Sequence, residues 1–114
     1  MAVNKKAKTY MESELHERIK SDLMDQLERN GTTGKYYEDL VNDYMDMWIS
    51  KCLLSDDIKQ RGVIVKYDNG GGQKGKKKNE SVELFNKVNA QMLKLLTEIG
   101  IKPSQAGEGD EEEM

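Results

Sequence analysis

The sequence predicts a mainly α-helical fold: a three-helix core with a long central helix, a short β-hairpin or strand-loop insertion before the last helix, and flexible termini. Three segments carry apolar residues at three- and four-residue steps, which is the period of an amphipathic helix. One β-branched run next to a glycine supplies the only strand-like segment. Both ends of the chain lack apolar periodicity, so neither is expected to pack.

Residues 1–8 are polar and rich in lysine, and they are predicted to form a flexible basic arm because nothing in them offsets the entropy of ordering. The first helix is predicted to begin at the capping-box spacing of Thr9 and Glu12 and to end at Asn30-Gly31. Its apolar residues recur every fourth position: Leu15, Ile19, Leu23 and Leu27.

Segment 36–61 is the longest periodic stretch and is predicted to form the central helix. The apolar residues expected on one side of it are Leu40, Val41, Tyr44, Trp48, Cys52 and Leu53. Ser55-Asp56-Asp57 interrupts this pattern. Either the helix breaks and caps again at that point, or this turn of it faces solvent.

Gly62 is expected to end the central helix, and Val63-Ile64-Val65 with Tyr67 predicts a strand. The insertion covers about 63–78. Asn69-Gly70 is a strong hairpin signal, but the returning segment 73–78 has no apolar face. The pattern therefore favours a ragged hairpin with a mobile tip.

The last helix is predicted to begin after Asn79, which can cap its first turn. Gly100 is expected to end it in a left-handed conformation, with Ile101 contacting the last turn and Pro103 preventing continuation, as in a Schellman motif. The predicted apolar stripe consists of Leu84, Val88, Met92, Leu95, Leu96 and Ile99. Residues 104–114 carry glycine and acid and are expected to be a disordered acidic tail.

Composition indicates one domain with a thin core. The chain has 114 residues, of which 36% are hydrophobic and 34% charged, and a domain of this size buries only about two-thirds of its unfolded surface. Oligomerisation is the natural way to cover the remaining apolar surface. The formal net charge of −3 hides two opposite regions, because five acids between 108 and 113 leave the rest of the chain at +2.

The expected compartment is a reducing one, since Cys52 is the only cysteine and allows no internal disulfide. Its place in a helix suggests burial rather than reactivity. No stretch approaches the roughly 20 apolar residues of a membrane span, so a soluble, cytoplasmic protein is expected.

No pattern of catalytic or metal-binding residues is found. His16 is the only histidine and has no orienting partner, so a surface or half-buried helix position is the expected reading. Asp39, Asp43 and Asp46 are more typical of a solvated helix face than of a magnesium site. The loop Gly70 to Lys76 has part of the spacing of a P-loop, but Lys77 stands where the magnesium-binding hydroxyl belongs. No cofactor is expected.

Two lysine clusters suit a polyanion. Lysines on mobile segments can follow a phosphate backbone without reading base sequence. The candidate DNA-binding residues are Lys5, Lys6 and Lys8 on the arm and Lys74, Lys76, Lys77 and Lys78 on the loop. Residue spacing leaves this reading and that of a solubilising tip equally open.

An aromatic and methionine-rich patch on the central helix is too wide for one narrow face, which predicts a subunit interface. The candidate oligomer-interface residues are Tyr36, Tyr37, Leu40, Tyr44, Met47 and Trp48 of the central helix, and Leu84, Val88, Met92 and Leu95 of the last helix.

The exit of the last helix also carries a family resemblance. Segment 98–104, Glu-Ile-Gly-Ile-Lys-Pro-Ser, resembles the ending of phage terminase small subunits of the P27 type, and the order of helices, strand and basic loop over about 9–105 is similar as well. Two positions depart from the family pattern: Glu80 follows Asn79 in place of proline, and Gln105-Ala106 follows Pro-Ser in place of an early arginine. No role of that arginine is carried over.

The resemblance implies a non-catalytic terminase subunit in which 9–103 form a helical oligomerisation and DNA-packaging domain. Implied partners are double-stranded viral DNA, the terminase large subunit and further copies of the chain, arranged as a ring in the cytoplasm of an infected bacterium. The subunit would bind viral DNA and regulate the motor and nuclease of the large subunit. The alternative is a helical oligomeric adaptor without nucleic-acid function, and a P-loop ATPase comes third.

Overall fold

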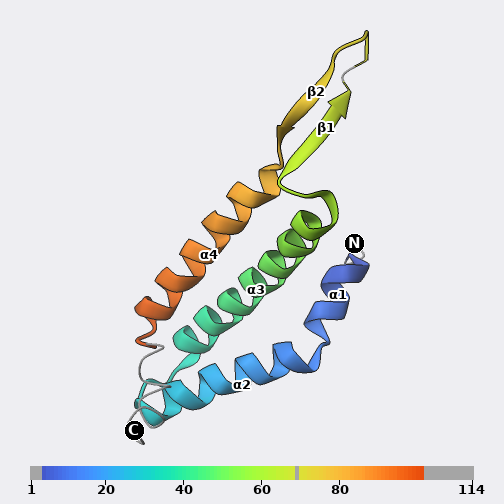
Figure 1. The fold of residues 1–114 in the computed structure, drawn as a ribbon. Coiled ribbons are helices and arrows are strands. Elements are labelled where there is room, and N and C mark those ends of the chain that lie inside the picture. The colour runs from blue at the N-terminus through green and yellow to red at the C-terminus, as the bar shows by residue number, and fades with distance from the viewer. Residues whose placement is uncertain (1–3, 69, 102–114) are drawn as a thin grey trace, which may run out of the picture.

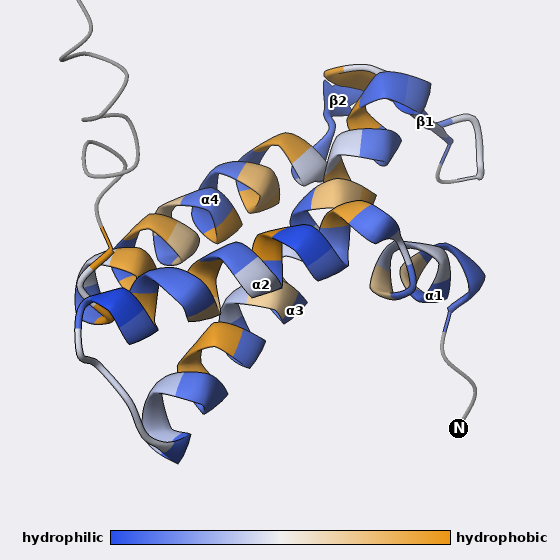
Figure 2. Cartoon of the chain, turned by 90° about the horizontal axis from the view of Figure 1, so that it is seen from below, coloured by the Kyte–Doolittle hydropathy of each residue, from blue (hydrophilic) through white to orange (hydrophobic). Residues whose placement is uncertain are grey.

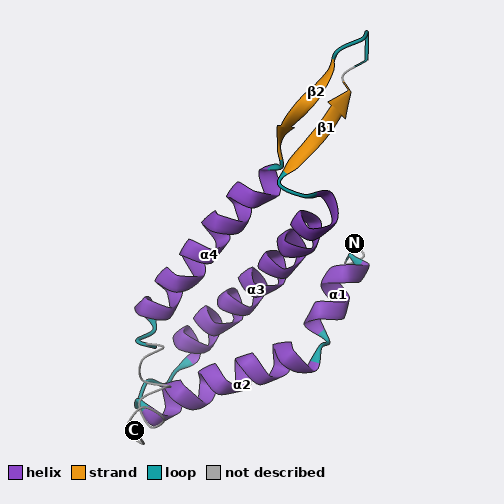
Figure 3. Cartoon of the chain, in the orientation of Figure 1, coloured by secondary structure: helices purple, strands orange, loops and turns teal. Residues whose placement is uncertain are grey.

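The computed structural model describes residues 4–68 and 70–101 and confirms a mainly helical fold with a strand pair before the last helix (Figure 1). The elements in order are α1 (Lys5–Met11), α2 (Glu14–Arg29), α3 (Lys35–Arg61), β1 (Ile64–Asp68), β2 (Lys74–Lys78) and α4 (Glu80–Glu98). α3 and α4 lie side by side, and α2 crosses the beginning of α3. The hairpin projects beyond the end of the α3–α4 pair (Figure 3).

The prediction of one first helix starting at Thr9 is wrong, because two helices occupy this region. Asn4 caps α1, and its side chain accepts from the backbone N–H groups of Lys6 and Ala7. Ser13 caps α2, with Oγ accepting from the N–H of His16 at 3.1 Å. Thr9 lies inside α1 and donates to the Lys5 carbonyl. Lys5 to Lys8 are therefore helical rather than part of an unstructured arm, and residues 1–3 lie outside the described part of the chain.

The central helix agrees with its predicted bounds to within one residue, and α3 is continuous through Ser55, Asp56 and Asp57. The interruption of the apolar pattern is explained by contacts: Asp56 accepts from Tyr10 of α1, and Asp57 accepts from Arg61 and from Ser81 of α4. This turn of the helix faces polar partners from its neighbours. Its half-buried side chains need no break in the backbone.

The hairpin is more regular than the sequence predicts. β1 and β2 pair antiparallel along all five residues, from Ile64 opposite Lys78 to Asp68 opposite Lys74. Backbone hydrogen bonding therefore continues through a strand that has no apolar face of its own. The turn adds a bond from Gln73 N–H to Gly70 O and one from Gly70 N–H to the Asp68 carboxylate. Asn69 lies outside the described residues.

The last helix follows the prediction at Asn79 and at Gly100-Ile101, whereas Pro103 and the predicted acidic tail, 104–114, lie outside the described residues. The Asn79 side chain accepts from the N–H of Ser81, and Gly100 takes a φ of 81°. The Gly100 N–H donates to Thr97 O and the Ile101 N–H donates to Leu96 O, the pair of bonds that defines a Schellman motif. Gly31 (φ 76°) ends α2 in the same way, with Thr32 N–H donating to Leu27 O.

Gly100→Ala is expected to destabilise the protein by about 1 kcal/mol, because a Cβ disfavours the left-handed conformation. Apart from its chain neighbours, no atom of residues 4–68 and 70–101 lies within 4 Å of the position of that Cβ, so the expected effect is one of backbone conformation. Urea unfolding measures the change. Gly100→Asn is the matched control, because asparagine tolerates this conformation, and equal losses for both variants would contradict the assignment.

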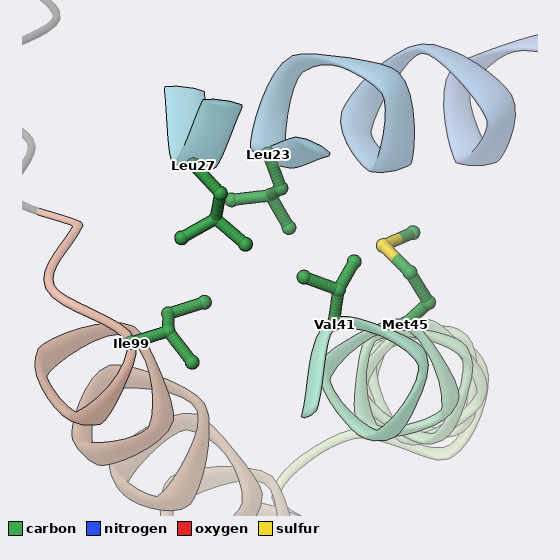
Figure 4. Packing of buried hydrophobic residues seen from close by; sticks show 5 residues of the cluster. All are labelled: Leu23, Leu27, Val41, Met45 and Ile99. Carbon is green, nitrogen blue, oxygen red and sulfur yellow. The ribbon is translucent and has the colours of Figure 1, made fainter. Parts of the chain in front are cut away.

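The core lies where the ends of α2 and α4 meet the beginning of α3 (Figure 4). Its buried residues are Leu23, Leu27, Val41, Met45 and Ile99. On α3 the buried positions are Val41, Met45 and Ile49, so the predicted stripe of that helix is wrong at its centre. The half-buried flank consists of Leu40, Tyr44, Trp48 and Cys52. On α4, Met92 and Ile99 are buried whereas Leu84 is 45% exposed.

The molecule is elongated. Its radius of gyration is 18.3 Å, whereas a compact domain of about 100 residues has about 13 Å. Apolar and polar residues alternate along the helices (Figure 2). The large hydrophobic side chains most exposed are Met11, Leu15, Tyr36, Val63, Ile64, Leu84 and Leu93. A single copy therefore leaves a considerable apolar surface uncovered.

Candidate nucleic-acid interface

Five lysines lie on the projecting hairpin, and strand pairing divides them between its two faces. Directly paired residues of an antiparallel ladder point to the same face. Lys66 lies opposite Lys76, and Lys78 and Lys74 pair with the two ends of β1. These four lysines therefore share one face, which we call the lysine face (Lys66, Lys74, Lys76 and Lys78). Lys77 points to the other face, together with the buried Val65.

Tyr67 and Gly75 keep the outer part of the hairpin closely paired. The two residues lie opposite each other on the face of Lys77. A Cβ at Gly75 would lie 2.7 Å from the Tyr67 hydroxyl oxygen and 2.9 Å from two ring carbons, so the ring covers the glycine backbone. The aromatic ring thus takes the place of the side chain that Gly75 lacks.

A polar cluster, formed by Asp57, Arg61, Asn79 and Ser81, joins the base of the hairpin to both long helices, and Asn79 and Ser81 are its buried members. Asn79 is 1% exposed and makes four side-chain hydrogen bonds. Its Oδ1 accepts from Arg61 at 3.0 Å and from Ser81 N–H at 2.9 Å, and its Nδ2 donates to Asp57 at 3.1 Å and to Gly62 O at 2.9 Å. The end of α3 is thereby fixed to the beginning of α4.

Asp57 is the acceptor at the centre of this cluster. Arg61 donates to both of its carboxylate oxygens, at 2.7 and 2.8 Å, and the Ser81 hydroxyl donates at 2.7 Å. Hydrogen bonds from Arg61 and then Ser81 hold the pKa of Asp57 well below its usual range. The ionised carboxylate of Asp57 is thus the form that this cluster stabilises.

The second predicted lysine cluster is carried by α1, which packs on the half of α3 that leads to the hairpin. The Tyr10 hydroxyl donates to the Asp56 carboxylate, and the Tyr10 ring meets Trp48 edge to face with centroids 5.9 Å apart. His16 of α2 is half-buried and contacts the same Trp48 ring at 5.6 Å. Lys5, Lys6 and Lys8 are exposed on this short helix, at the same end of α3 as the hairpin (Figure 1).

The attachment of α1 is expected to weaken at alkaline pH. The hydrogen bond to Asp56, followed by burial, raises the pKa of Tyr10 to about 12. Because the folded state favours the neutral phenol, its contribution is complete below the ordinary pKa of about 10 and is lost as pH rises towards 12. Ultraviolet titration of phenolate, compared between the wild type and Tyr10→Phe, isolates this group. A difference curve centred near 10 would contradict the prediction.

The predicted interface residues differ in how far the single copy covers them. Met92 is 3% exposed and is therefore unavailable as a contact surface between copies. Those that pack beside the core of the same chain are Tyr37, Leu40, Tyr44 and Trp48. The half-buried ones are Met47, Val88 and Leu95. Tyr36, 61% exposed, and Leu84 remain on the surface.

The described residues were also compared with the patterns of a metal site, a reactive cysteine and a membrane span. Within residues 4–68 and 70–101, no group of three His, Cys, Asp or Glu side chains could hold a metal ion. Cys52 is half-buried, and burial raises the pKa of its thiol. No described helix is long and apolar enough to cross a membrane.

Lys66 is a candidate residue of this basic hairpin that the sequence analysis did not single out. It alternates with Val65 and Tyr67 along β1, which is a period-two signal. That signal became informative only with the register of β2, because pairing places Lys66 beside Lys76. Because the returning strand was expected to be ragged, the sequence did not predict that Lys66 pairs with Lys76.

The fold and the hairpin define a small helical protein with a basic, two-stranded projection held at the end of its longest helices. The chain belongs to the family of phage terminase small subunits, whose model matches residues 21–112. Membership associates it with phage genome packaging. No curated protein and no solved structure matches the chain. The matched range includes the hairpin, whereas α1 with Lys5, Lys6 and Lys8 precedes it.

Proposed function

We propose that this chain is a non-catalytic terminase small subunit of the P27 type. It self-associates into a ring, binds double-stranded viral DNA through the hairpin, and regulates the motor and nuclease of a separate large subunit. It acts in the cytoplasm of the infected bacterium and needs no cofactor. Lys5, Lys6 and Lys8 add a second, weaker contact to the same DNA.

The observation that carries this proposal is the basic hairpin itself. Five lysines lie on two five-residue strands that project from the helices, and each is exposed. Among the described residues, the acids within 4 Å of a hairpin lysine are Asp68 of β1 and Glu80 at the start of α4. A projecting, strongly positive element attracts a phosphate backbone and gains affinity by releasing counterions.

Self-association is supported by the shape of the chain and by its exposed apolar residues. A thin core and an elongated outline leave Leu15, Tyr36, Ile64 and Leu93 more than half exposed. Contacts between copies would bury such side chains, which is the usual remedy for a small domain. A ring would also present many hairpins to one DNA molecule, so that weak contacts add up.

Light scattering at moderate salt, with and without duplex DNA, tests the proposal. A closed multimer that takes up DNA is expected. In the variant with Lys74, Lys76, Lys77 and Lys78 changed to glutamine, we expect the slope of log affinity against log salt to become shallower by about 3 to 4. The matched control changes Lys20, Lys35, Lys87 and Lys94 of the helices, which alters net charge equally and leaves most binding intact.

A monomer or simple dimer that ignores DNA would overturn the proposal and favour the helical adaptor. Equal loss of affinity in the hairpin variant and the helix control would show that net charge, and not the hairpin, governs binding. Both variants change exposed or half-buried side chains, so circular dichroism should remain that of the wild type.

A further inference from the structure

We infer that the hairpin binds the phosphate backbone with the lysine face alone, that Lys66 of β1 is part of this site, and that Lys77 is not. The inference rests on the proposed DNA binding and adds the orientation in which the DNA lies. It divides a lysine run that is continuous in sequence, because Lys76, Lys77 and Lys78 alternate between two faces.

The first argument is the spacing of the lysine face. Side chains two residues apart on one strand are about 7 Å apart, so Lys74, Lys76 and Lys78 form a straight row about 14 Å long. Lys66 lies beside the middle of that row, with its Cβ about 5 Å from that of Lys76. One DNA strand presents a phosphate every 3.4 Å along the axis, so the row extends along about four phosphates.

The second argument is the repulsion between Lys66 and Lys76. Like charges placed directly opposite each other destabilise a strand pair. The pairing register places these two side chains directly opposite each other, and within the described chain neither ammonium has an acid within 4 Å. A bound phosphate between the two side chains would relieve the repulsion. In the absence of a bound anion, repulsion between Lys66 and Lys76 therefore destabilises the strand pair, and a bound anion removes this destabilisation.

The third argument is the different surroundings of Lys77. It shares its face with Val65, which is 9% exposed, so that face is partly covered at the base of the hairpin. The Lys77 ammonium lies 3.8 Å from the Glu80 carboxylate. Lys77 is exposed, but it lies beside an acid and shares its face with the buried Val65. On the lysine face only Lys74 has a described acid within 4 Å, Asp68 at 3.9 Å, so Lys66, Lys76 and Lys78 are the better phosphate ligands.

The chemistry of the lysine face indicates backbone contact and not base reading. Lysine is a point charge on a flexible stem, whereas base recognition uses planar or bidentate groups. The lysine face contains no arginine, asparagine or glutamine. The partner surface is therefore the phosphate row of duplex DNA, bound with little dependence on base sequence.

The test compares single glutamine substitutions in the full-length protein, with a mixed-sequence duplex as the probe. Lys76→Gln and Lys66→Gln are each expected to weaken binding roughly tenfold at about 0.1 M salt and to reduce the salt slope by about 1. Lys77→Gln is the matched control, since it changes the adjacent residue of the same strand, and less than a twofold effect is expected. Lys76→Arg should retain binding.

A second variant separates the site from hairpin stability. Lys66→Glu converts the repelling pair into an attractive one, so hydrogen exchange of the β1 and β2 amides should slow while DNA binding falls. If Lys66 acted only by affecting hairpin stability, slower exchange of the hairpin amides would be accompanied by stronger DNA binding.

If Lys77→Gln weakens binding as much as Lys76→Gln, or if Lys66→Gln has no effect, the inference is overturned while hairpin binding of DNA stands. If the wild type does not bind duplex DNA, or if no hairpin variant differs from it, the proposed function fails and the inference fails with it.

Discussion

Leu27→Ala is expected to destabilise the protein by about 3–5 kcal/mol, the largest effect of any single change considered for this chain. Leu27 is 2% exposed and lies among Leu23, Val41 and Ile99 (Figure 4). Its truncation removes apolar contact between three helices and leaves a cavity that the fixed ends of α2 and α4 cannot close. Small domains have roughly 5–10 kcal/mol in total, so the variant should be close to unfolding.

Urea unfolding followed by circular dichroism measures this loss. Leu93→Ala is the matched control, because Leu93 has the same side chain on α4 but is 55% exposed. We expect it to change the free energy of unfolding by no more than about 0.5 kcal/mol. Similar losses for the two variants would mean that the core does not lie where α2, α3 and α4 meet. Measurements at several protein concentrations separate folding from self-association.

Asn79→Ala is expected to cost about 2–4 kcal/mol, with the effect concentrated in the hairpin. The substitution removes a helix cap and four side-chain hydrogen bonds at a position that is 1% exposed. Gly62 O and the Asp57 carboxylate would each lose a donor, and the Ser81 N–H would lose its acceptor. The Asp57 carboxylate keeps its bonds from Arg61 and Ser81, so the cost comes mainly from the Gly62 carbonyl and the Ser81 N–H, which lose the partner that Asn79 supplies.

Hydrogen exchange with mass spectrometry locates this effect. The amides of β1 and β2 are expected to exchange faster in Asn79→Ala, while those of α2 beside Leu23 and Leu27 keep most of their protection. Asn86→Ala, at an exposed site of the same helix, is the matched control and should behave like the wild type. Uniform loss of protection along the chain would show that the cluster supports the whole fold and not the hairpin mount.

Local sequence patterns were sufficient to predict where α3 and α4 begin and end. The period of apolar residues predicts α3 to within one residue, and Asn79 and Gly100 mark the ends of α4. These signals are readable because a helix is stabilised by residues three and four apart and is ended by the conformation of single residues. The same local logic failed at Thr9, because Thr9 lies inside α1 and Ser13 is the cap that forms for α2.

The face of the hairpin on which each lysine lies could not be predicted from local sequence patterns. Sequence alone identifies Lys74, Lys76, Lys77 and Lys78 as a basic cluster. It does not show that Lys77 faces away from the others or that Lys66 joins them, because both depend on which residues of β1 and β2 are paired. Register is a property of two strands, and no segment read by itself contains it.

The sequence by itself determined a mainly helical chain, a basic segment before the last helix and an acidic end, since these follow from composition and short-range periodicity. Only the tertiary structure decided that Met45 and Ile49 replace Tyr44 and Trp48 at the centre of the α3 contact, and that Asp57 meets Ser81. The physical reason is distance along the chain. Packing and buried hydrogen bonds join residues more than twenty positions apart, and their energies depend on the arrangement of whole helices.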